Sequence, residues 1–373
     1  MANKPTIIFI APQLQQPRVI RRIATVYNEG YPIKVYGFDS GIFSENLKSI
    51  SFPVTEIIKR NKKDSKLKKS ICFIKTLRRI KKENSKDDIF YIFSAEMGNF
   101  SWVLRNRKTI YEEADILGAY FTKESLRKFF RWIDRGTIKR SQLTVFTSEG
   151  FVDYTFGENN RPGNVLVIPN KLNSRFFNAE RKAEVCKSQT DINHIRFGFV
   201  GIIRYPNTII RFAEVIGRVF PQHEFHFFGT PDVASYVDSV KRMPNVFLHG
   251  PFINPVELPS IYNQIDIVIS CYDTTSWNVR VAEPNKLYEA VFFERPIVVS
   301  EGTFLAKQVE RYNAGYAIKA DDDKSIIDFV KTISANDLER FQDAENKVHW
   351  ERLIDDTKPF LERIKQIAGS KNE

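Results

Sequence analysis

The stretch RFGFVGIIRYPNTIIRFAEVI, residues 196–216, decides the fold that we expect for this chain. Its first part, RFGFV, is a short apolar run that is typical of a buried strand, and Gly201 follows it directly. The residues from Thr208 to Val219 continue with the pattern of a helix. A strand, a glycine loop and a helix in this order form the repeating unit of a doubly wound α/β domain.

The same alternation of strands and helices extends in both directions along the 373 residues. It predicts two Rossmann-like α/β domains that face a cleft lined by the carboxyl ends of their strands. We place the first domain at residues 1–172 and the second at 193–345, joined by a polar linker, and expect residues 346–373 to form a C-terminal helix that packs on the first domain. The predicted strands are 6–12, 34–38, 89–94, 109–115, 144–148, 165–170, 196–201, 224–229, 246–250, 265–270, 296–300 and 316–319. The predicted helices are 18–27, 124–139, 208–219, 233–241, 258–264, 285–293 and 337–367.

Composition and motif searches exclude several classes of protein. With 42% hydrophobic and 27% charged residues, the chain is neither disordered nor of low complexity. No apolar run is long enough for a membrane span, and the start of the sequence is interpreted as a strand rather than a signal peptide. Three scattered cysteines without a Cys-x-x-Cys pair favour a reducing cytoplasm. The histidines show no metal-ligand spacing except His223, Glu224 and His226, which lie on a predicted strand and which we interpret as sheet residues, so we expect no metal and no other cofactor.

The net charge of +11 is concentrated in one segment that begins at Lys59 and ends at Lys82. This segment holds twelve Lys and Arg residues and one acid, whereas the rest of the chain has 44 basic and 44 acidic residues. A helix of this composition suits an anionic membrane surface, although a helix that is merely solvated is the alternative. The apolar residues that would face the membrane are Leu67, Ile71, Ile74 and Leu77.

Nucleic acid is the other anionic partner that a basic segment can bind. The segment carries aliphatic residues rather than aromatic stacking platforms, and the chain has no nucleic-acid-binding motif, so we expect no nucleic acid. A second stretch, residues 123–140, mixes Phe129, Phe130 and Trp132 with basic residues. We interpret it as an amphipathic helix whose aromatic side packs in the core.

Four passages of the sequence resemble retaining glycosyltransferases of family 4, which have the GT-B fold and use nucleotide-sugars. VLVIPNKLNSRFF resembles the interdomain strand of the family, and FGFVGIIRYPNTIIRFAEVI resembles the first strand, loop and helix of its donor domain. VFLHGPFINPVELPSIYNQIDIVISC resembles the strand, nucleobase loop and short helix that follow. PNKLYEAVFFERPIVVS resembles the helix with the second Glu of the family motif Glu-x7-Glu.

The resemblance implies a donor site in the second domain. Arg204 and Lys286 would bind the diphosphate, and Glu289 would accept hydrogen bonds from the ribose hydroxyls. An exposed loop arginine, a solvated lysine and a surface glutamate are the alternative interpretations of these residues. The loops after three strands would frame the nucleotide, although ordinary turn chemistry also explains their glycines and prolines. The remaining donor-site candidates are Gly201, Gly229, Thr230, Phe252, Ile253, Asn285 and Leu287.

The sequence departs from the family pattern at two positions of this site. The first Glu of the motif is replaced by Val281, and Glu283, two residues later, is our candidate for the contact with the donor sugar. Asn207 stands where the family often has a second cation after Arg204. The predicted catalytic residues are therefore Glu283, Arg204 and Lys286.

The first domain is expected to bind the acceptor. The histidine that the family often has there is absent, because no histidine precedes residue 194. Glu113 and Asp115 follow a predicted strand, and Gln13 and Arg18 lie in the first loop; helix-start acids are an equally good interpretation of the two carboxylates.

The interpretation that follows is a GT-B glycosyltransferase. It would move a sugar from a nucleotide diphosphate-sugar to a glycan or polyprenyl-linked glycan in bacterial surface polysaccharide biosynthesis. We expect it in the cytoplasm, bound peripherally to the inner face of the membrane. A nucleotide-sugar epimerase of the same fold, a basic nucleic-acid-binding protein and a catalytically inactive partner subunit are the alternatives. The sequence does not identify the base, the sugar, the linkage or the acceptor.

Overall fold

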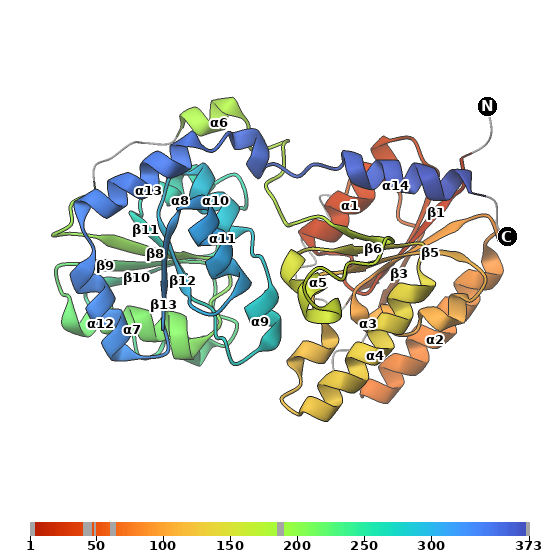
Figure 1. The fold of residues 1–373 in the computed structure, drawn as a ribbon, viewed down its shortest axis with the longest axis horizontal. Coiled ribbons are helices and arrows are strands. Elements are labelled where there is room, and N and C mark those ends of the chain that lie inside the picture. Colours follow the sequence, from red (N-terminus) through yellow and green to blue (C-terminus); the bar gives the residue numbers. More distant parts are fainter. Residues whose placement is uncertain (1–3, 40–46, 48–49, 60–64, 185–189, 371–373) are drawn as a thin grey trace. The chain divides into compact units, whose positions relative to one another are not determined.

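The computed structural model describes residues 4–39, 47, 50–59, 65–184 and 190–370. Residues 60–64 of the basic segment and Cys186 lie outside this set. The chain divides into unit 1, residues 1–169 and 356–373, and unit 2, residues 170–355. Figure 1 shows that each unit is a sheet with helices on both faces. Among the described residues, no helix is long and apolar enough to cross a membrane.

Unit 1 contains a seven-stranded sheet in which all neighbouring strands are parallel, with the order β3-β2-β1-β4-β5-β6-β7. Its central strands are buried on both faces, which explains why they are continuous apolar runs in the sequence. The strands are β1 (Ile7–Ala11), β2 (Ile33–Asp39), β3 (Glu56–Lys59), β4 (Ile89–Phe93), β5 (Lys108–Glu113), β6 (Leu143–Phe146) and β7 (Val165–Val167).

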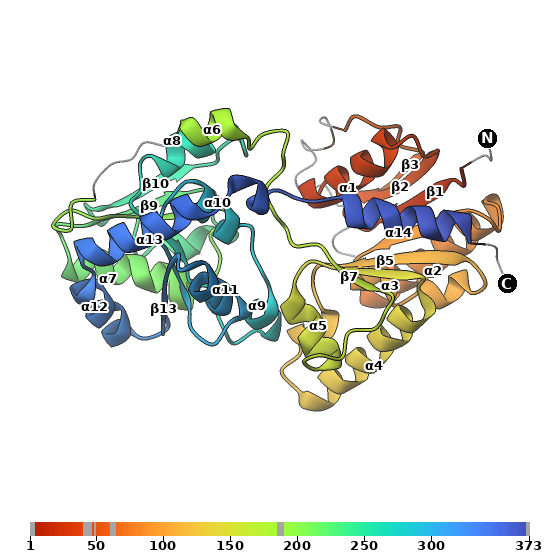
Figure 2. The ribbon, with the colours of Figure 1, turned by 45° about the horizontal axis from the view of Figure 1, so that its top comes forward.

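Two layers of helices cover this sheet (Figures 1 and 2). On one face, α1 (Pro17–Asn28) and the C-terminal helix α14 (Lys358–Gly369) pack side by side, and Phe360 of α14 is fully buried against Tyr91 of the sheet. The other face carries α2 (Lys66–Glu83), α3 (Ala95–Gly98), η2 (Ser101–Leu104) and α4 (Glu124–Arg140). The turn η3 (Leu117–Tyr120) precedes α4, and α5 (Glu149–Phe156) follows β6.

The structure places the apolar residues of α2 differently from our prediction. Leu77 is fully buried and packs with Phe73 and Ile80 against the sheet. These three side chains form the apolar side of α2 that contributes to the core of unit 1. Only the first two turns expose apolar side chains, with Leu67 72% exposed and Ile71 45% exposed. The prediction that Leu77 faces a membrane together with Leu67 is therefore wrong.

The expectation for the aromatic residues of α4 is also wrong. Phe129 and Trp132 were predicted to lie in the core, but they are 52% and 71% exposed. Their rings lie 6.3 Å apart, and Phe130 stacks on Phe121 instead of entering the core. The helix uses its other side for packing, where Ile138 is buried.

Unit 2 contains a six-stranded parallel sheet with the order β10-β9-β8-β11-β12-β13. Its two faces carry separate hydrophobic cores, and α7 (Arg211–Val219) packs on one of them while α10 (Lys286–Phe292) packs on the other. The strands are β8 (Arg196–Val200), β9 (Glu224–Phe228), β10 (Val246–Gly250), β11 (Ile267–Ser270), β12 (Ile297–Ser300) and β13 (Gly315–Ile318). The other helices are α6 (Ala179–Ala183), α8 (Leu258–Tyr262), α9 (Trp277–Val281), α11 (Phe304–Tyr312), α12 (Asp323–Thr332) and α13 (Ala335–Lys347).

The stretch that we interpreted as a linker is packed on unit 2 where it is described. Phe177 is buried and meets the ring of Phe292 edge-on at 5.1 Å. Lys182 forms an ion pair with Glu294 at 2.8 Å. Because of these contacts, the described part of this polar stretch belongs to unit 2 and is not a linker between the two units.

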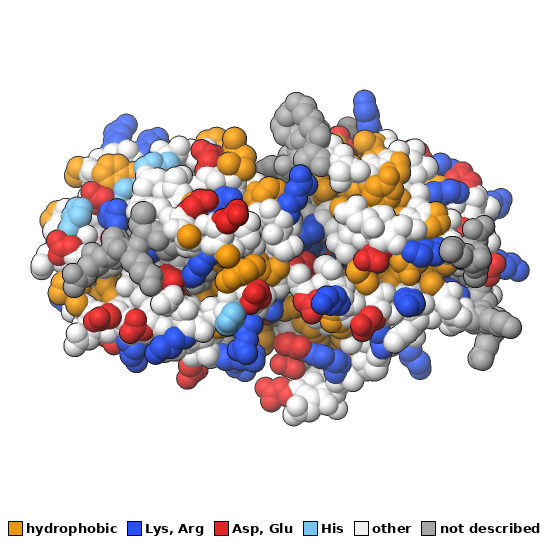
Figure 3. Space-filling model, turned by 90° about the horizontal axis from the view of Figure 1, so that it is seen from above, with side chains coloured by type: hydrophobic (Ala, Val, Ile, Leu, Met, Phe, Trp, Pro, Cys, Tyr) orange, Lys and Arg blue, Asp and Glu red, His pale blue; other side chains and the backbone are white. Residues whose placement is uncertain are grey.

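Two predicted helices have other lengths in the structure. The helix expected at 233–241 is only a short 3-10 turn, η5 (Ala234–Val237). The helix expected at 337–367 is two helices, α13 and α14, separated by the 3-10 turn η6 (Trp350–Leu353). On the face shown in Figure 3, acidic and basic side chains are interspersed, in agreement with the charge balance outside the basic segment.

Candidate functional site

The carboxyl edge of the unit 2 sheet is lined by glycines where three neighbouring strands end. Gly201 follows β8, Gly229 follows β9 and Gly250 ends β10. Gly201 donates its backbone N–H to Phe228 at 2.8 Å, and Gly229 donates to Gly250 at 2.7 Å. A Cβ atom at Gly229 would collide with the carbonyl oxygen of Gly201, so no larger residue fits there. Gly229 is therefore packed against the neighbouring loop, whereas a Cβ at Gly250 would meet no atom within 4 Å, so the open part of this edge lies at Gly250.

Lys286 lies beside this glycine edge. It is the first residue of α10, and its Cε is 3.8 Å from the position that a Cβ at Gly201 would occupy. Its side chain is buried, and Nζ donates to Oε2 of Glu289 at 2.5 Å. The ammonium group is thus held in one place, one helical turn from its partner carboxylate.

Glu289 is only 1% exposed and accepts hydrogen bonds from three protein groups. Besides Lys286, these are the hydroxyl of Tyr262 at 2.7 Å and Nδ2 of Asn285 at 2.6 Å. Burial and the nearby Glu289 carboxylate raise the pKa of Tyr262 well above its usual range, so its hydroxyl remains a donor. Both oxygens of Glu289 hold protein groups here, and its contact with a ribose stays a prediction.

Tyr262 is a site residue that we did not single out from the sequence. It lies in α8, 27 residues before Glu289, and the fold brings the two together. The sequence signal is weak, because a tyrosine among apolar residues normally indicates core packing. Tyr262 is recognised as a site residue only once the structure shows a buried carboxylate that needs its hydroxyl as a hydrogen-bond donor.

Glu283 is buried just before α10 and accepts a hydrogen bond from the hydroxyl of Tyr288 at 2.6 Å. Val281, which replaces the first motif Glu, is the last residue of α9. Burial and Glu283 together raise the pKa of Tyr288, and burial and Glu283 also raise that of Tyr312. Glu283 therefore lies in a region with two phenols that remain protonated at neutral pH.

Arg204 lies in the exposed loop after β8. Its Nε is 3.3 Å from Oδ2 of Asp232, which belongs to the loop after β9. Backbone hydrogen bonds join these two loops, since Ile203 donates to Thr230 at 2.9 Å and Asp232 donates to Ile203 at 3.0 Å. Arg204 and Thr230 are thus neighbours on one edge of the sheet, as a shared phosphate or base contact would require.

The other donor candidates differ in their access to solvent. Ile253 is 65% exposed, and Phe252 is half-buried against one hydrophobic core of unit 2. The side chain of Leu287 is fully buried in the same core, so only its backbone is left for a ligand. Asn207, which stands where a second cation was expected, lies 3.5 Å from Asp273.

Three of the four acceptor candidates line one small pocket of about 60 Å³ in unit 1. Gln13, Arg18 and Asp115 meet there, at the carboxyl ends of the neighbouring strands β1, β4 and β5. Asp115 also accepts a hydrogen bond from Tyr120 at 3.2 Å. Arg18 binds Oε1 of Glu112 at 2.5 Å, so its position is fixed by an acid that sequence reasoning missed.

Glu112 is fully buried and accepts hydrogen bonds from Arg18, from Arg22 at 3.0 Å and from the hydroxyl of Tyr91. Burial alone would raise the pKa of Glu112, but the two guanidinium groups outweigh it and lower the pKa. The sequence signal that could have identified Glu112 is its position next to Glu113 at the end of a buried strand. Successive side chains of a strand point to opposite faces of the sheet, so the two acids must lie in different surroundings.

Glu113 lies on the opposite face and is not part of this pocket. It is fully buried beside Asp134 of α4, and the hydroxyl of Tyr111 donates to Oδ1 of Asp134 at 3.2 Å. Burial and the Asp134 carboxylate raise the pKa of Glu113 well above its usual range, and burial raises that of Asp134 to about 6. Burial and this like charge therefore favour the protonated form of Glu113. Among the described residues, no cluster of His, Cys, Asp and Glu could hold a metal ion.

No family model and no curated protein matches the sequence, but many solved structures match the fold. HepE from Anabaena, solved in complex with UDP and glucose and with UDP-glucose, is 15% identical with a TM-score of 0.66, covering 97% of this chain and 98% of its own. The chain has the GT-B fold. Sucrose-phosphate synthase from Thermosynechococcus elongatus is 12% identical with a TM-score of 0.69, covering 98% of this chain and 97% of its own. A putative UDP-N-acetylglucosamine 2-epimerase from Listeria monocytogenes is 10% identical with a TM-score of 0.56, over 92% of this chain and 94% of its own.

Proposed function

We propose that this GT-B protein transfers a sugar from a nucleotide diphosphate-sugar to a glycan acceptor, with unit 2 binding the donor and unit 1 the acceptor. The observation that carries the proposal is the buried Lys286, held by Glu289 beside the glycine edge of unit 2. A fixed cation at the carboxyl ends of parallel strands suits a diphosphate. The UDP-glucose complex of HepE makes UDP-glucose the first donor to test.

In the proposed reaction, the bond between the anomeric carbon and the diphosphate oxygen breaks. The acceptor oxygen bonds to the same carbon, and the acceptor proton passes to the leaving phosphate oxygen. Lys286 and Arg204 stabilise the negative charge that develops on the diphosphate. We propose retention of the anomeric configuration, on the resemblance described above, and we propose that no metal takes part.

Two carboxylates of unit 2 would orient the donor. Glu283, which accepts a hydrogen bond from Tyr288, would accept hydrogen bonds from the sugar, and Glu289 would accept them from the ribose once the Asn285 amide turns away. Hydroxyl groups of the nucleotide-sugar would then replace protein hydrogen-bond donors on the same oxygen atoms. The two carboxylates would thus keep their hydrogen bonds when the nucleotide-sugar binds.

The acceptor is proposed to be a glycan, carried by a polyprenyl lipid, in surface polysaccharide assembly at the inner face of the cell membrane. Gln13, Arg18 and Asp115 offer hydrogen-bond groups of both kinds in one pocket of unit 1. The exposed side chains of Phe129, Trp132 and Leu67 and the basic residues of α2 and α4 suit an anionic bilayer surface.

The experiment that tests the function has two steps. A thermal-shift screen with UDP, GDP, dTDP and CMP identifies the nucleotide, because a ligand that binds only the folded state raises its Tm. The matching nucleotide-sugar is then incubated with glycan acceptors and the products are analysed. A glycosylated acceptor together with the free nucleotide supports the proposal. Free nucleotide with an altered sugar and no glycosylated acceptor indicates an epimerase, and a screen without any stabilising nucleotide overturns the donor site.

A further inference from the structure

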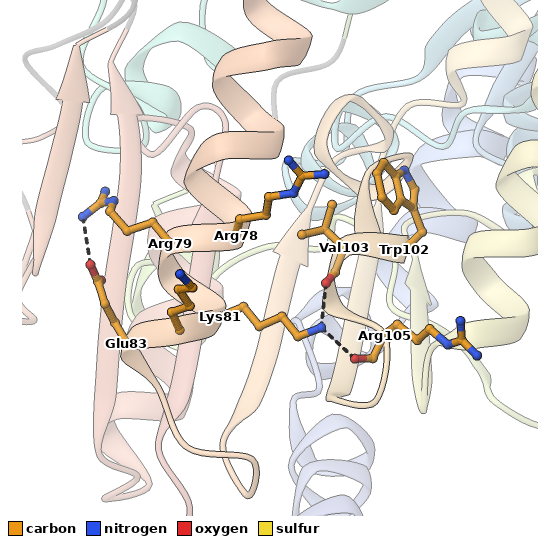
Figure 4. A pocket seen from close by; sticks show the side chains of 8 residues that line it. Arg78, Arg79, Lys81, Glu83, Trp102, Val103 and Arg105 are labelled. Carbon is orange, nitrogen blue, oxygen red and sulfur yellow. Dashed lines mark hydrogen bonds and ion pairs between the residues drawn. The ribbon is translucent and has the colours of Figure 1, made fainter.

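A groove of about 720 Å³ in unit 1 is separate from every residue discussed as donor or acceptor site. It lies between the last turns of α2 and the short turn η2 (Figure 4). Trp102 of η2 is 48% exposed beside it, a large exposure for a residue that could pack inward. The lining residues are Arg78, Arg79, Lys81, Lys82, Glu83, Trp102, Val103 and Arg105.

The two walls of the groove are tied together by hydrogen bonds. Nζ of Lys81 donates to the carbonyl oxygens of Val103 and Arg105, at 2.9 Å each (Figure 4). Arg107 donates in the opposite direction, from Nη2 to the carbonyl oxygen of Lys81 at 2.8 Å. The groove is therefore formed before any ligand arrives, which lowers the cost of binding.

The positive charge of the groove is only partly neutralised. Arg79 is engaged by Glu56 at 2.6 Å and by Glu83 at 3.6 Å. For the side chains of Arg78, Lys82 and Arg105, the described part of the chain provides no hydrogen bond and no ion pair. Burial, together with the charges of Arg107 and Arg105, lowers the pKa of Lys81, which indicates that cations outnumber acids around it.

The position of the groove separates it from the acceptor pocket. Helix α2 ends before β4 begins, and η2 leads into β5, so the groove lies toward the end of the sheet where these strands start. Gln13, Arg18 and Asp115 lie at the carboxyl end of the same sheet. A ligand in the groove would thus occupy a second site, away from the proposed chemistry.

We infer that the groove between α2 and η2 binds a phosphate ester. Arg78, Lys82 and Arg105 bind the phosphate oxygens, and the organic part of the ligand packs on the indole of Trp102. Guanidinium groups match phosphate geometry with two parallel hydrogen bonds, and a tryptophan ring gives apolar contact to a glycerol or sugar carbon skeleton. The same chemistry is offered by the headgroup of an anionic phospholipid and by a soluble phosphate ester, and the experiment distinguishes these sources.

The test compares two variants of equal charge in the full chain. The groove variant combines Arg78→Gln, Lys82→Gln and Arg105→Gln. The control combines Lys139→Gln, Lys358→Gln and Lys365→Gln, which are exposed and do not line this groove. The soluble probe is glycerol 3-phosphate, measured by calorimetry and by tryptophan fluorescence, with Trp102→Phe to assign the signal. The bilayer probe is phosphatidylcholine vesicles with and without phosphatidylglycerol, measured by co-sedimentation at low salt.

We expect the wild type and the control to bind at least one probe and the groove variant to bind it about tenfold or more weakly, because charge-assisted hydrogen bonds are lost. Binding of glycerol 3-phosphate identifies a soluble ester as the ligand class. Binding of phosphatidylglycerol vesicles alone, weakened in the groove variant and kept in the control, identifies a lipid headgroup as the ligand of the groove. The inference is overturned if the wild type binds neither probe, or if both variants lose binding equally. Arg105→Gln alone, in an exposed turn, serves if the triple variant does not fold.

Discussion

Nζ of Lys286 donates to Oε2 of Glu289 at 2.5 Å, and both side chains are almost completely buried. A buried ion pair of this kind is costly to break from one side, since the remaining charge has lost its water and its partner. Tyr262 and Asn285 complete the shell around the carboxylate, so Glu289 organises the site as well as being a candidate ligand. Mutation of this pair can therefore change two quantities, the stability of the fold and the affinity for the nucleotide, and the structure allows the two to be tested separately.

Glu289→Ala is expected to reduce the free energy of unfolding by about 3–5 kcal/mol, because it leaves Lys286 buried without its carboxylate. Nucleotide affinity should fall in the same variant. Lys286→Met removes the cation and keeps the volume, and Glu289 retains its bonds from Tyr262 and Asn285. We therefore expect Lys286→Met to lose nucleotide affinity with a smaller loss of stability.

Chemical denaturation and calorimetry measure these two quantities separately. The variant Lys347→Met, at an exposed residue at the end of α13, controls for the loss of one positive charge. If Lys286→Met binds the nucleotide as tightly as the wild type, Lys286 does not contact the diphosphate.

Arg204→Ala should weaken nucleotide binding without changing Tm. Its ion pair with Asp232 is half-exposed, and exposed pairs contribute little to stability. Loss of one charge-assisted hydrogen bond to the diphosphate should lower affinity about ten- to a hundredfold.

Asp232→Ala is the matched control, since it breaks the same ion pair but leaves the guanidinium in place. Calorimetry should then give an affinity equal to or higher than that of the wild type. Equal losses in both variants would mean that the ion pair itself, and not a phosphate contact, maintains the loop.

The buried carboxyls Glu113 and Asp134 predict a pH dependence of stability. Their pKa values are raised in the folded state, mainly by burial, so their contribution to stability is complete at low pH and is lost as pH rises through these values. The loss should begin at about pH 4, where carboxyls of the unfolded chain ionise, and continue through about pH 6 for Asp134 and to higher pH for Glu113. Glu112, whose pKa is lowered, acts in the opposite direction and at more acidic pH.

Glu113→Gln removes the second ionisable group from the pair and leaves an amide that can donate to Asp134. The Tm of this variant relative to the wild type should therefore rise as pH increases across this window. Glu158→Gln, at an exposed acid of unit 1, is the control and should leave the difference flat. A Tm difference independent of pH for Glu113→Gln would contradict a raised pKa of Glu113.

Strands and most helices of this fold could be predicted because their information is local. The apolar run RFGFV predicts β8 with an error of one residue at its end. A short apolar run followed by glycine is typical of a buried strand. The sequence EIIK gives no such signal, and β3 at the sheet edge was missed because it has only two apolar residues between two charged ones. The break between α13 and α14 was missed because helical periodicity resumes after it.

Partners of buried polar groups could not be predicted, because they come from distant parts of the chain. Glu112 and Arg22 are 90 residues apart, and Tyr262 and Glu289 are 27 apart. Local spacing places each of these residues on a strand or helix, but only the strand order brings them within hydrogen-bond distance. The exposure of Phe129 and Trp132 could not be predicted for the same reason. Periodicity shows that α4 is amphipathic, but it does not show which side of the helix packs against the sheet.

Turnover should persist in the presence of EDTA, because Lys286 and Arg204 are proposed to supply the positive charge at the diphosphate. Initial rates with the donor identified above should be the same before and after dialysis against EDTA. A manganese-dependent glycosyltransferase assayed in parallel confirms that the treatment removes metal. Activity that disappears and returns with Mn²⁺ would show that the two side chains do not suffice.

The last prediction concerns the exposed aromatic residues of α4. Phe129 and Trp132 lie close together with at least half of their surface open to water, and Lys128, one helical turn before Trp132, is 72% exposed. Aromatic rings enter the interface of a bilayer, and each nearby Lys or Arg adds about 1 kcal/mol of attraction to anionic lipid within the Debye length. The protein should therefore co-sediment with vesicles that contain phosphatidylglycerol, be released by high salt and ignore neutral vesicles.

Phe129→Ser with Trp132→Ser should remove most of this binding without affecting Tm, since neither side chain contributes to the core. Phe247→Ser with Leu248→Ser, at exposed positions of β10 in unit 2, is the matched control and should bind vesicles as the wild type does. Turnover on a water-soluble acceptor should be unchanged in the α4 variant, whereas turnover on a lipid-linked acceptor in vesicles should fall. Equal vesicle binding by the α4 variant and the wild type would exclude α4 as the membrane contact and leave the basic residues of α2 as the remaining surface to test.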